Sequence, residues 1–519
     1  MATHVPENEL IYVAKLNETF EAPGAPIKCK WRESLTKPMP SPHCRHDWKQ
    51  QYKNGVFPDV LAMIGNTPMV KLNNIPKSYG LECNIYAKCE FLNPGGSVKD
   101  RMVKRIFEDI ERQGLIKPGM TIIEYSSGNT GIAVALVCAL KGYKCIIVMS
   151  EKISDEKEAV IVSLGAKVVR CPVTAGLEAP DGLFGTAYRL HKEIPDSFIL
   201  DQFGHPGNPL THYDTTANEI LDQLENKVDM IVFGGGTGGT VTGIGRKFRE
   251  VSPHTKIVGF DPVGSRYAYP PSLNKTDVTF FEVEGIGYEI VPPTLDQSVC
   301  DYWIKTTDLD ALPMAKRLMK EEGLLVGMSS GAGVAAALKA AKELKKGQNC
   351  VVLLPDSIRN YMTKFVSDRW MEAKGYQPCE NKNNVWWWDQ KVSNLKYRPP
   401  VLVDNDDSLE KVMSLLQKEQ RNEAIVVSAN GNLVGAVTIS TIRNKILAGS
   451  LQSNDAISRC TSRILPKLDD NSIIGRAFRI IENDPFALVT KTTGEGSGKI
   501  ESPVGIIYGD DIYNYISNH

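Results

Sequence analysis

Short apolar runs rich in β-branched residues recur along the middle of the chain, from about Val60 onward. The runs are Thr121–Ile123, Cys145–Met149, Lys167–Val169, Met230–Phe233, Lys256–Gly259 and Cys350–Leu354. Each is short enough for a strand that is buried on both faces. Stretches with helical character, such as Gly131–Lys141 and Thr216–Glu225, separate them. Alternating strands and helices predict an α/β fold with a parallel sheet.

The pattern changes at both ends of this region and divides the chain into four parts. Residues 1–49 are polar and Pro-rich and form an N-terminal arm, and residues 50–375 form the α/β core. Residues 376–398 form a linker that contains Trp386–Trp388, of which at least one is expected to pack against a neighbouring domain. Residues 399–519 repeat a strand, helix, strand, strand, helix pattern, in copies spanning 399–450 and 455–519. Neither copy covers its own apolar face, so we expect one pseudo-symmetric module.

Composition and charge narrow the classes of function. The 519 residues include 60 Lys and Arg against 61 Asp and Glu, a net charge of −1, and 42% are hydrophobic. Because attraction to nucleic acid needs a basic excess, we expect no nucleic-acid partner. No run of about 18 apolar residues occurs and the N-terminus lacks a signal-peptide pattern, so we expect no membrane span or export. Eleven scattered cysteines favour reduced thiols in a cytoplasmic protein.

Three segments rich in glycine or hydroxyl groups carry the candidate chemistry. Asn93–Arg101 leads two glycines into a helix beginning near Asp100 and places Lys99 beside free backbone N–H groups. Glu124–Gly131 follows a strand and gathers hydroxyl, amide and helix N-terminal N–H groups, which suit a carboxylate. Gly234–Thr240 lies between a strand and a helix, and its glycines let the backbone wrap a phosphate.

Each segment also has a simpler interpretation when it is taken alone. Lys99 could be a solvated loop lysine, and Glu124–Gly131 could be an N-cap cluster. The glycine loop also fits a dinucleotide site in which Asp261 is the acidic residue that contacts the ribose. Combined in one chain, a lysine, a carboxylate cradle and a phosphate cradle describe a pyridoxal-phosphate site.

The chain resembles the fold-type II pyridoxal-phosphate enzymes, and within them the cystathionine β-synthases, from about Cys29 to its end. Three segments separate it from the related cysteine synthases and threonine deaminases, namely Glu282–Tyr288, Pro355–Phe365 and Trp386–Trp388. The resemblance implies a fold-type II catalytic core, a haem-binding N-terminal arm and a C-terminal regulatory pair of CBS domains. It also implies a homodimer.

The resemblance implies a role for each matching position of the core. Lys99 is expected to bind pyridoxal 5'-phosphate covalently and to act as general acid and base. The other expected cofactor contacts are Asn129, Gly236, Thr237, Gly238, Gly239, Thr240 and Ser329. The expected substrate contacts are Ser126, Ser127, Thr130, Gln202, Glu284, Gly285 and Tyr288, and the segment from Glu284 to Tyr288 resembles a gate for the second substrate. A neutral Ser329 facing the pyridine nitrogen weakens the ring as an electron sink and favours elimination over transamination.

The implied reaction replaces the β-hydroxyl of L-serine with the thiol of L-homocysteine, giving L-cystathionine and water. L-Cysteine as first substrate would release hydrogen sulfide. Phe203 stands where animal relatives often have Tyr, and Tyr125 departs from the family's usual Pro, so we expect altered substrate affinities without loss of the reaction. The phenylalanine at position 203 slightly favours a rival interpretation, in which the protein is a cysteine synthase or a serine dehydratase. A rival of another class is a catalytically inactive sensor of adenosyl ligands.

The N-terminal arm implies a second cofactor, haem b. Cys29 and His43 match the axial ligands of the haem iron, and Arg246 matches the arginine that pairs with the thiolate. Two alternatives stay open. Cys29, His43, Cys44 and His46 have the types and number of ligands for zinc, or the arm holds no metal.

The C-terminal pair resembles modules that commonly bind adenosyl ligands. In relatives activated by S-adenosylmethionine, one cleft uses a Phe-Asp-Gln-Ala stretch with a later Thr and Asp. Here the stretch is Arg421–Ala424, and the later pair is Tyr508 and Asp511. Arg421 and Tyr508 are expected to fill the cleft, which predicts little or no activation by S-adenosylmethionine.

Overall fold

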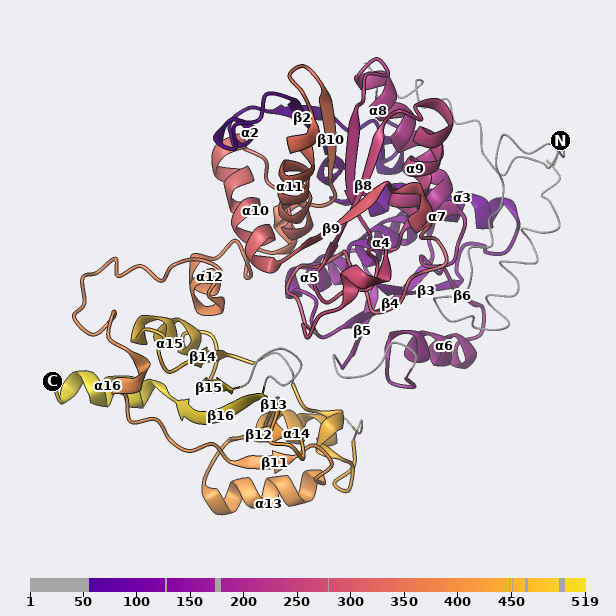
Figure 1. Cartoon of the computed structure of the whole chain (residues 1–519). Helices are drawn as coiled ribbons and strands as arrows, with labels where there is room; N and C mark the ends of the chain where they lie inside the picture. The colour runs from indigo at the N-terminus through magenta and orange to yellow at the C-terminus, as the bar shows by residue number, and fades with distance from the viewer. Residues whose placement is uncertain are drawn as a thin grey trace. The chain divides into compact units, whose positions relative to one another are not determined.

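The computed structural model describes residues 56–126, 128–172, 179–278, 280–447, 449, 451–462, 465–493 and 500–519. The chain divides into two compact units, one of residues 1–170 and 183–362 and the other of residues 171–182 and 363–519. Figure 1 labels their helices and strands. The described part contains no helix that is both long and apolar enough to span a bilayer.

The first unit contains two sheets made mainly of parallel strands. The larger has the order β1 (Met69–Leu72), β2 (Asn84–Cys89), β10 (Asn349–Leu354), β7 (Met230–Gly234), β8 (Lys256–Pro262) and β9 (Tyr302–Thr306). Only β1 and β2 pair in antiparallel fashion, and every other pair in this sheet is parallel. The smaller has the order β5 (Lys167–Cys171), β4 (Lys144–Ser150), β3 (Thr121–Ser126) and β6 (Ser197–Ile199), and β3 runs parallel to β4 and β6.

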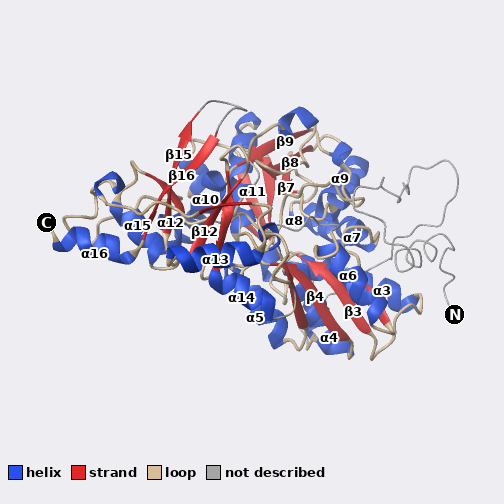
Figure 2. Cartoon of the chain, turned by 90° about the horizontal axis from the view of Figure 1, so that it is seen from below, coloured by secondary structure: helices blue, strands red, loops and turns tan. Residues whose placement is uncertain are grey.

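Helices accompany both sheets, as the strand–helix alternation predicts (Figure 2). They are α2 (Ile75–Ser78), α3 (Lys99–Arg112), α4 (Asn129–Lys141), α5 (Asp155–Ser163), α6 (Leu183–Glu193), α7 (Gly207–Thr211), a π-helical turn His212–Thr216, α8 (Ala217–Gln223), α9 (Gly239–Val251), α10 (Asp308–Glu322) and α11 (Met328–Ala340). Buried apolar side chains of α3 and α4 pack with those of β3 and β4 in one core cluster. α10 and α11 lie side by side next to the larger sheet (Figure 1).

The predicted parallel α/β core is confirmed, and all six apolar runs form strands. The runs do not reveal β1, β2, β6 and β9, because polar residues interrupt these strands or the strands are short. In β2, for example, Lys88 is fully buried where an apolar residue would be expected. Its charge is balanced by a buried ion pair with Glu219 at 2.7 Å, a contact that hydropathy does not predict.

The second unit contains the repeat predicted for the C-terminal part. One copy comprises β11 (Leu402–Asp404), α13 (Leu409–Glu419), β12 (Glu423–Val427), β13 (Leu433–Thr438) and α14 (Ile439–Leu447), and the other comprises β14 (Lys467–Asp469), α15 (Ile474–Ile481), β15 (Ala487–Thr493), β16 (Ile500–Ile507) and α16 (Gly509–Ser517). Both sheets have the same topology, with a parallel first pair and an antiparallel second pair. Ile425 and Ala436 pack against Leu488 and Ile506 of the other copy, so the copies share a core.

The segment between the core and the repeat packs against the second copy. It begins with α12 (Asp368–Lys374), whose Glu372 forms an ion pair of 2.6 Å with Arg479 of α15. Trp388 is only 6% exposed and lies edge-on to Phe478, with ring centroids 5.8 Å apart. The expected packing of at least one linker tryptophan is therefore confirmed.

Candidate active site

Lys99 lies at the first residue of α3, where two glycines bring the chain into the helix. The Gly95 N–H donates to the Asp100 carboxylate, and Gly96 has a positive φ of 84° that favours glycine. The Val98 N–H donates to the Pro355 carbonyl at 2.8 Å, which ties the turn to the chain after β10. Burial lowers the pKa of the Lys99 ammonium to about 8, and the nearby Asp356 carboxylate opposes this shift. At pH 7 about a tenth of the amine would therefore be neutral and nucleophilic, far more than for an ordinary lysine.

The glycine loop between β7 and α9 lies directly beside Lys99. A Cβ atom on Gly236 would be 3.6 Å from Lys99 Nζ and only 2.5 Å from the Gly285 carbonyl oxygen. Gly238 has a φ of 96°, and a Cβ atom on Gly239 would overlap the Asn208 side chain. The backbone conformation and the close neighbours thus require glycine, as expected for a loop that closes around a ligand.

Asn129 and Ser329 lie at the N-terminal ends of α4 and α11, and both are buried. The Asn129 Nδ2 donates to Asp356 at 2.8 Å, and its Oδ1 accepts from Asn360 at 2.9 Å. A Cβ atom on Gly285 would lie 3.8 Å from Asn129 Nδ2, so this amide borders the same space as the glycine loop.

The donor set fits pyridoxal phosphate. A buried amine of lowered pKa lies next to a glycine loop at the start of a helix, and an oriented amide faces the same region. When bound there, the cofactor would supply an electron sink for charge at the substrate's Cα. Lys99 would hold it, the loop from Gly236 to Thr240 would take its phosphate, and Asn129 and Ser329 would contact its ring.

The predicted carboxylate cradle is only partly described, because Ser127 lies outside the described residues. The Ser126 hydroxyl accepts from the N–H groups of Gly128 and Gly131 at 2.9 and 2.8 Å. The Thr130 hydroxyl donates to Gln202 at 2.6 Å, so the structure brings these two predicted residues together. Gln202 in turn donates to the Tyr125 carbonyl, which anchors it to the end of β3.

Glu284, in the predicted gate, forms a fully buried ion pair with Lys157 of α5 at 2.6 Å. Lys157 also donates to the Tyr361 hydroxyl at 3.2 Å, and its ammonium lies 4.3 Å from the centre of the Tyr361 ring. The gate segment is shaped by Gly285 and Gly287, whose φ values are 87° and 75°. Its far end places Tyr288 against Phe203.

An aromatic cluster surrounds Phe203, the position that the resemblance marks as a departure from the family pattern. The Phe203 ring lies edge-on to Tyr288 with centroids 5.3 Å apart and stacks on Tyr125 at 5.9 Å. Phe184 lies edge-on to both Phe203 and Tyr125. The Tyr125 hydroxyl donates to Asp201. The two departures from the family pattern, Tyr125 and Phe203, are therefore neighbours in space.

Sequence reasoning missed the side chains that link these parts. Asp356, Asn360 and Tyr361 connect Asn129 with the Lys157–Glu284 pair, and all three are completely buried. All three lie in the segment Pro355–Phe365, which at the level of sequence served only to separate the chain from related enzymes. The segment's sequence does not indicate which side chains it contacts.

Two other residues predicted to serve a cofactor site, Asp261 and Arg246, form ion pairs within the protein. Asp261, the acidic residue of the dinucleotide interpretation, is buried, and it accepts from Lys305 at 2.7 Å and from the Tyr267 N–H at 3.0 Å. It therefore serves a structural role. Arg246 forms an ion pair of 2.9 Å with Asp296. Cys29, His43, Cys44 and His46 lie outside the described residues, and the described residues contain no cluster of three or more potential metal ligands.

Comparison with known proteins agrees with this geometry. The pyridoxal-phosphate dependent enzyme family matches residues 60–356, and the CBS domain family matches residues 392–448. A cystathionine beta-synthase of Apis mellifera is 46% identical over 91% of this chain and 93% of its own length. The chain belongs to the cystathionine β-synthase family. A family member from Rattus norvegicus is 47% identical over 90% of this chain and 83% of its own length.

The fold of the catalytic unit is similar to that of a solved structure. The O-acetylserine dependent cystathionine beta-synthase of Helicobacter pylori matches with a TM-score of 0.55 and 37% identity, over 60% of this chain and 99% of its own. The protein is thus a pyridoxal-phosphate dependent enzyme whose fold-type II core is followed by CBS domains. The inactive adenosyl-sensor interpretation is not supported, because Lys99 and its cradle are intact.

Proposed function

We propose that the protein condenses L-serine with L-homocysteine to give L-cystathionine and water. The observation that carries this proposal is the buried Lys99 Nζ beside the glycine loop, where Gly285 of the gate segment also approaches Gly236 and the Asp356 carboxylate lies nearby. The amine can take the proton from the substrate's Cα and return a proton to the leaving hydroxyl. The bond between Cβ and oxygen breaks and water leaves with the proton taken from Cα. The homocysteine thiol then adds to Cβ, and its proton replaces the one removed from Cα, so serine and homocysteine give cystathionine and water.

The surrounding residues support this role in binding and in excluding water. Ser126 ends β3 and Thr130 lies in the first turn of α4, where the substrate carboxylate would meet the helix N-terminus. Gln202, which follows β6, accepts from the Thr130 hydroxyl at 2.6 Å. The buried Lys157–Glu284 pair and the aromatic cluster around Phe203 add closely packed side chains that would help to exclude water. A closed site is needed because water would compete with the thiol.

The test is a substrate panel on the purified protein loaded with pyridoxal phosphate. Cystathionine is measured by mass spectrometry with L-serine and L-homocysteine, pyruvate with L-serine alone, and cysteine with O-acetylserine and sulfide. We expect cystathionine to form fastest, and hydrogen sulfide to be released when L-cysteine replaces L-serine. Pyruvate or cysteine as the main product would contradict the proposal.

A second candidate uses O-acetylserine in place of serine. The Helicobacter pylori enzyme, which matches 60% of this chain, is O-acetylserine dependent. The animal relatives match 90% or more, including the repeat. We therefore favour serine, and a competition between equal concentrations of the two substrates decides the point.

We also propose that the N-terminal arm binds haem b through Cys29 and His43. The support is the likeness to the haem-binding arm and the position of Arg246 on α9, the helix that begins at the glycine loop. A Soret band that is lost in both Cys29→Ala and His43→Ala proteins is expected. Zinc found in its place by metal analysis would favour the Cys29, His43, Cys44, His46 alternative.

We propose further that S-adenosylmethionine does not activate the enzyme. Near the start of the last helix of the second copy, Arg398 lies 4.8 Å from the centre of the Tyr508 ring and 3.3 Å from Asp511. Arg421 donates to the Tyr508 hydroxyl at 3.2 Å, and that hydroxyl donates to Glu423. By the resemblance, these side chains would stand where an adenosyl ligand binds in the activated relatives, and two guanidinium groups would repel its sulfonium.

The remaining proposals concern assembly and location. We propose a homodimer in the cytoplasm. The nine cysteines within the described residues are all free thiols, which agrees with a reducing compartment. Light scattering on the purified protein tests the dimer.

A further inference from the structure

Two hydroxyl groups of the glycine loop are each held by a side chain from one helical segment. Asn208 of α7 donates from Nδ2 to the Thr237 hydroxyl at 2.8 Å and to the Gln202 carbonyl at 2.8 Å. Four residues later, His212 Nε2 lies 3.2 Å from the Thr240 hydroxyl. Residues four apart share one face of a helix, so this face of the segment supports the loop.

The packing leaves these contacts little freedom. A Cβ atom on Gly243 of α9 would be 2.2 Å from the Pro209 carbonyl oxygen and 2.8 Å from His212 Cβ. This glycine lets α9 approach His212 closely. The His212 side chain is buried. His212 is also the first residue of a π-helical turn, a local distortion of the helix that is frequent at functional sites.

The partners of each group limit where its hydrogen atoms can lie. The Asn208 amide donates twice, so the Thr237 oxygen is an acceptor there and its own proton remains for another acceptor. His212 Nδ1 lies 2.9 Å from the Thr216 hydroxyl. A neutral imidazole has one donor and one acceptor nitrogen, so only one of its two threonines can receive a proton from it.

We propose that His212 is a positioning residue that keeps its proton on Nε2, accepts the Thr216 proton at Nδ1 and donates to Thr240. The Thr240 hydroxyl proton is then left for the cofactor phosphate, just as the Thr237 proton is. This inference rests on the proposed use of pyridoxal phosphate, and it assigns a task to a residue outside the loop.

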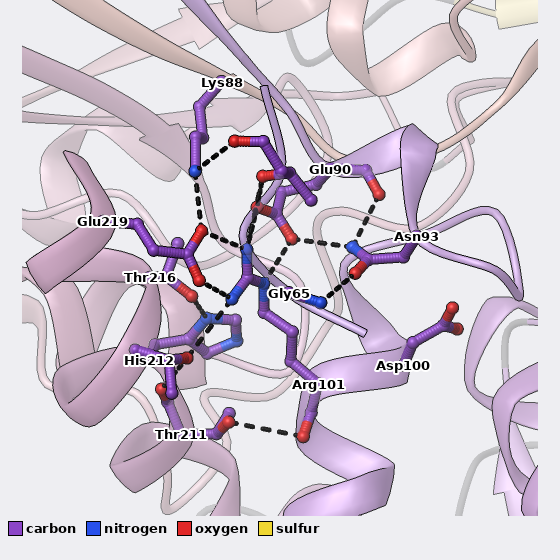
Figure 3. Close-up of polar contacts among 12 residues, drawn as sticks. Gly65, Lys88, Glu90, Asn93, Asp100, Arg101, Thr211, His212, Thr216 and Glu219 are labelled. Carbon is purple, nitrogen blue, oxygen red and sulfur yellow. Dashed lines mark hydrogen bonds and ion pairs between the residues drawn. The ribbon is translucent and has the colours of Figure 1, made fainter. Parts of the chain in front are cut away.

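Charged neighbours keep His212 neutral. Figure 3 shows His212 and Thr216 beside Arg101, whose guanidinium lies between Glu90 and Glu219. Burial, followed by the positive charges of Arg101 and Lys99, holds the pKa of His212 well below its usual range, and Glu219 opposes them only partly. An imidazolium would donate from both nitrogens and would lose the acceptor for Thr216.

The arrangement would favour phosphate binding by preorganisation. Hydrogen bonds from hydroxyl groups to a charged phosphate are stronger than those between neutral groups. Because Thr237 and Thr240 are already oriented, less freedom is lost when the phosphate binds.

The first test uses the holoenzyme without substitution. Nitrogen-15 NMR of protein labelled at histidine distinguishes the two neutral tautomers and the imidazolium, and His212→Gln assigns the signal. We expect the Nε2–H tautomer of His212, unchanged between about pH 8 and about pH 6. An Nδ1–H tautomer or an imidazolium would overturn the proposal.

The second test measures the dissociation constant of pyridoxal phosphate from the apoenzyme. His212→Leu removes the donor that orients Thr240 and should weaken binding about tenfold, the effect of losing the Thr240 hydrogen bond to the charged phosphate. His212→Gln keeps an N–H group and should weaken it much less. In a Thr240→Ala protein, His212→Leu should cause no further weakening of pyridoxal-phosphate binding.

Equal weakening by His212→Leu in both backgrounds would show a general structural role and contradict the proposal. If His212→Leu does not fold, the tautomer measurement on the wild-type protein decides. Neither readout depends on cystathionine synthesis, so failure of the proposed reaction and failure of this inference are distinguishable.

Discussion

At the scale of single residues, the site depends on how burial changes the chemistry of Lys99. The sequence indicates Lys99 through its glycines, yet the residue that moderates its charge, Asp356, is distant along the chain. Desolvation favours the neutral amine, and Asp356 favours the ammonium form. Such balances arise from contacts between remote segments, which neither periodicity nor motif spacing predicts.

Replacement of Asp356 tests this balance. Asp356→Asn removes a negative charge that stabilises the ammonium, so the pKa of Lys99 should fall below about 8. The rate of covalent cofactor uptake by the apoenzyme needs the neutral amine and therefore rises with pH through this pKa. We expect its midpoint at a lower pH in Asp356→Asn and an unchanged midpoint in Glu225→Gln, a surface control. A midpoint that stays or rises would refute the role of Asp356.

At the scale of elements, a buried ion cluster joins β2, α3 and α8. It consists of Lys88, Glu90, Arg101 and Glu219, whose side chains converge in Figure 3. Arg101 is two residues from Lys99, so the cluster fixes the first turn of α3. Apolar runs predicted the sheet strands around it, but the cluster itself could not be predicted, because each charge is buried only in the presence of its partners.

Two lysine–glutamate pairs offer a matched comparison of burial. The Lys88–Glu219 side chains are 0% and 2% exposed, whereas those of Lys227 and Glu225 are 71% and 80% exposed. Lys88→Met leaves buried charge unbalanced and should lower the free energy of unfolding by about 3–5 kcal/mol. Lys227→Met should leave the thermal midpoint nearly unchanged. Calorimetry on both variants checks this, and equal midpoints would contradict it.

The same cluster predicts a dependence on acid. Burial alone would raise the pKa of Glu219, but Arg101 and Lys88 outweigh it and lower this pKa to about 2, below its unfolded value of 4.5. A lowered pKa stabilises the fold above the unfolded pKa, and this contribution is lost as pH falls toward the folded pKa. The thermal midpoint of the wild type should therefore exceed that of Glu219→Gln by the largest amount near neutral pH. This difference should become smaller below about pH 4.5. A difference that does not change with pH would exclude this linkage.

At the scale of the whole chain, the pattern of apolar runs predicted an α/β core and a repeated C-terminal module. The structure confirms both, down to the shared core around Ile425 and Leu488. The resemblance singled out Arg421 and Tyr508 as departures from the activated relatives, and in the structure these two side chains contact each other. The pairing of Arg398 with Asp511 was not predicted, because it depends on how the two copies pack.

The contacts of Tyr508 predict the outcome of a calorimetric titration. S-adenosylmethionine should release no binding heat in the micromolar range and should leave turnover unchanged, because Arg398 and Arg421 pack on Tyr508 where the resemblance places the adenosyl ligand. Arg421→Ala with Tyr508→Ala serves as the comparison in which space is restored. Micromolar binding with raised turnover in the wild-type protein would contradict this interpretation.

The central claim is that Lys99 holds pyridoxal phosphate within the glycine loop. The most direct measurement is borohydride reduction of the purified holoenzyme followed by peptide mapping by mass spectrometry. We expect the pyridoxyl-phosphate mass on the peptide that contains Lys99 and on no other lysine, and no labelled peptide from a Lys99→Ala protein. A label on another lysine, or an unlabelled Lys99 in active enzyme, would contradict the account.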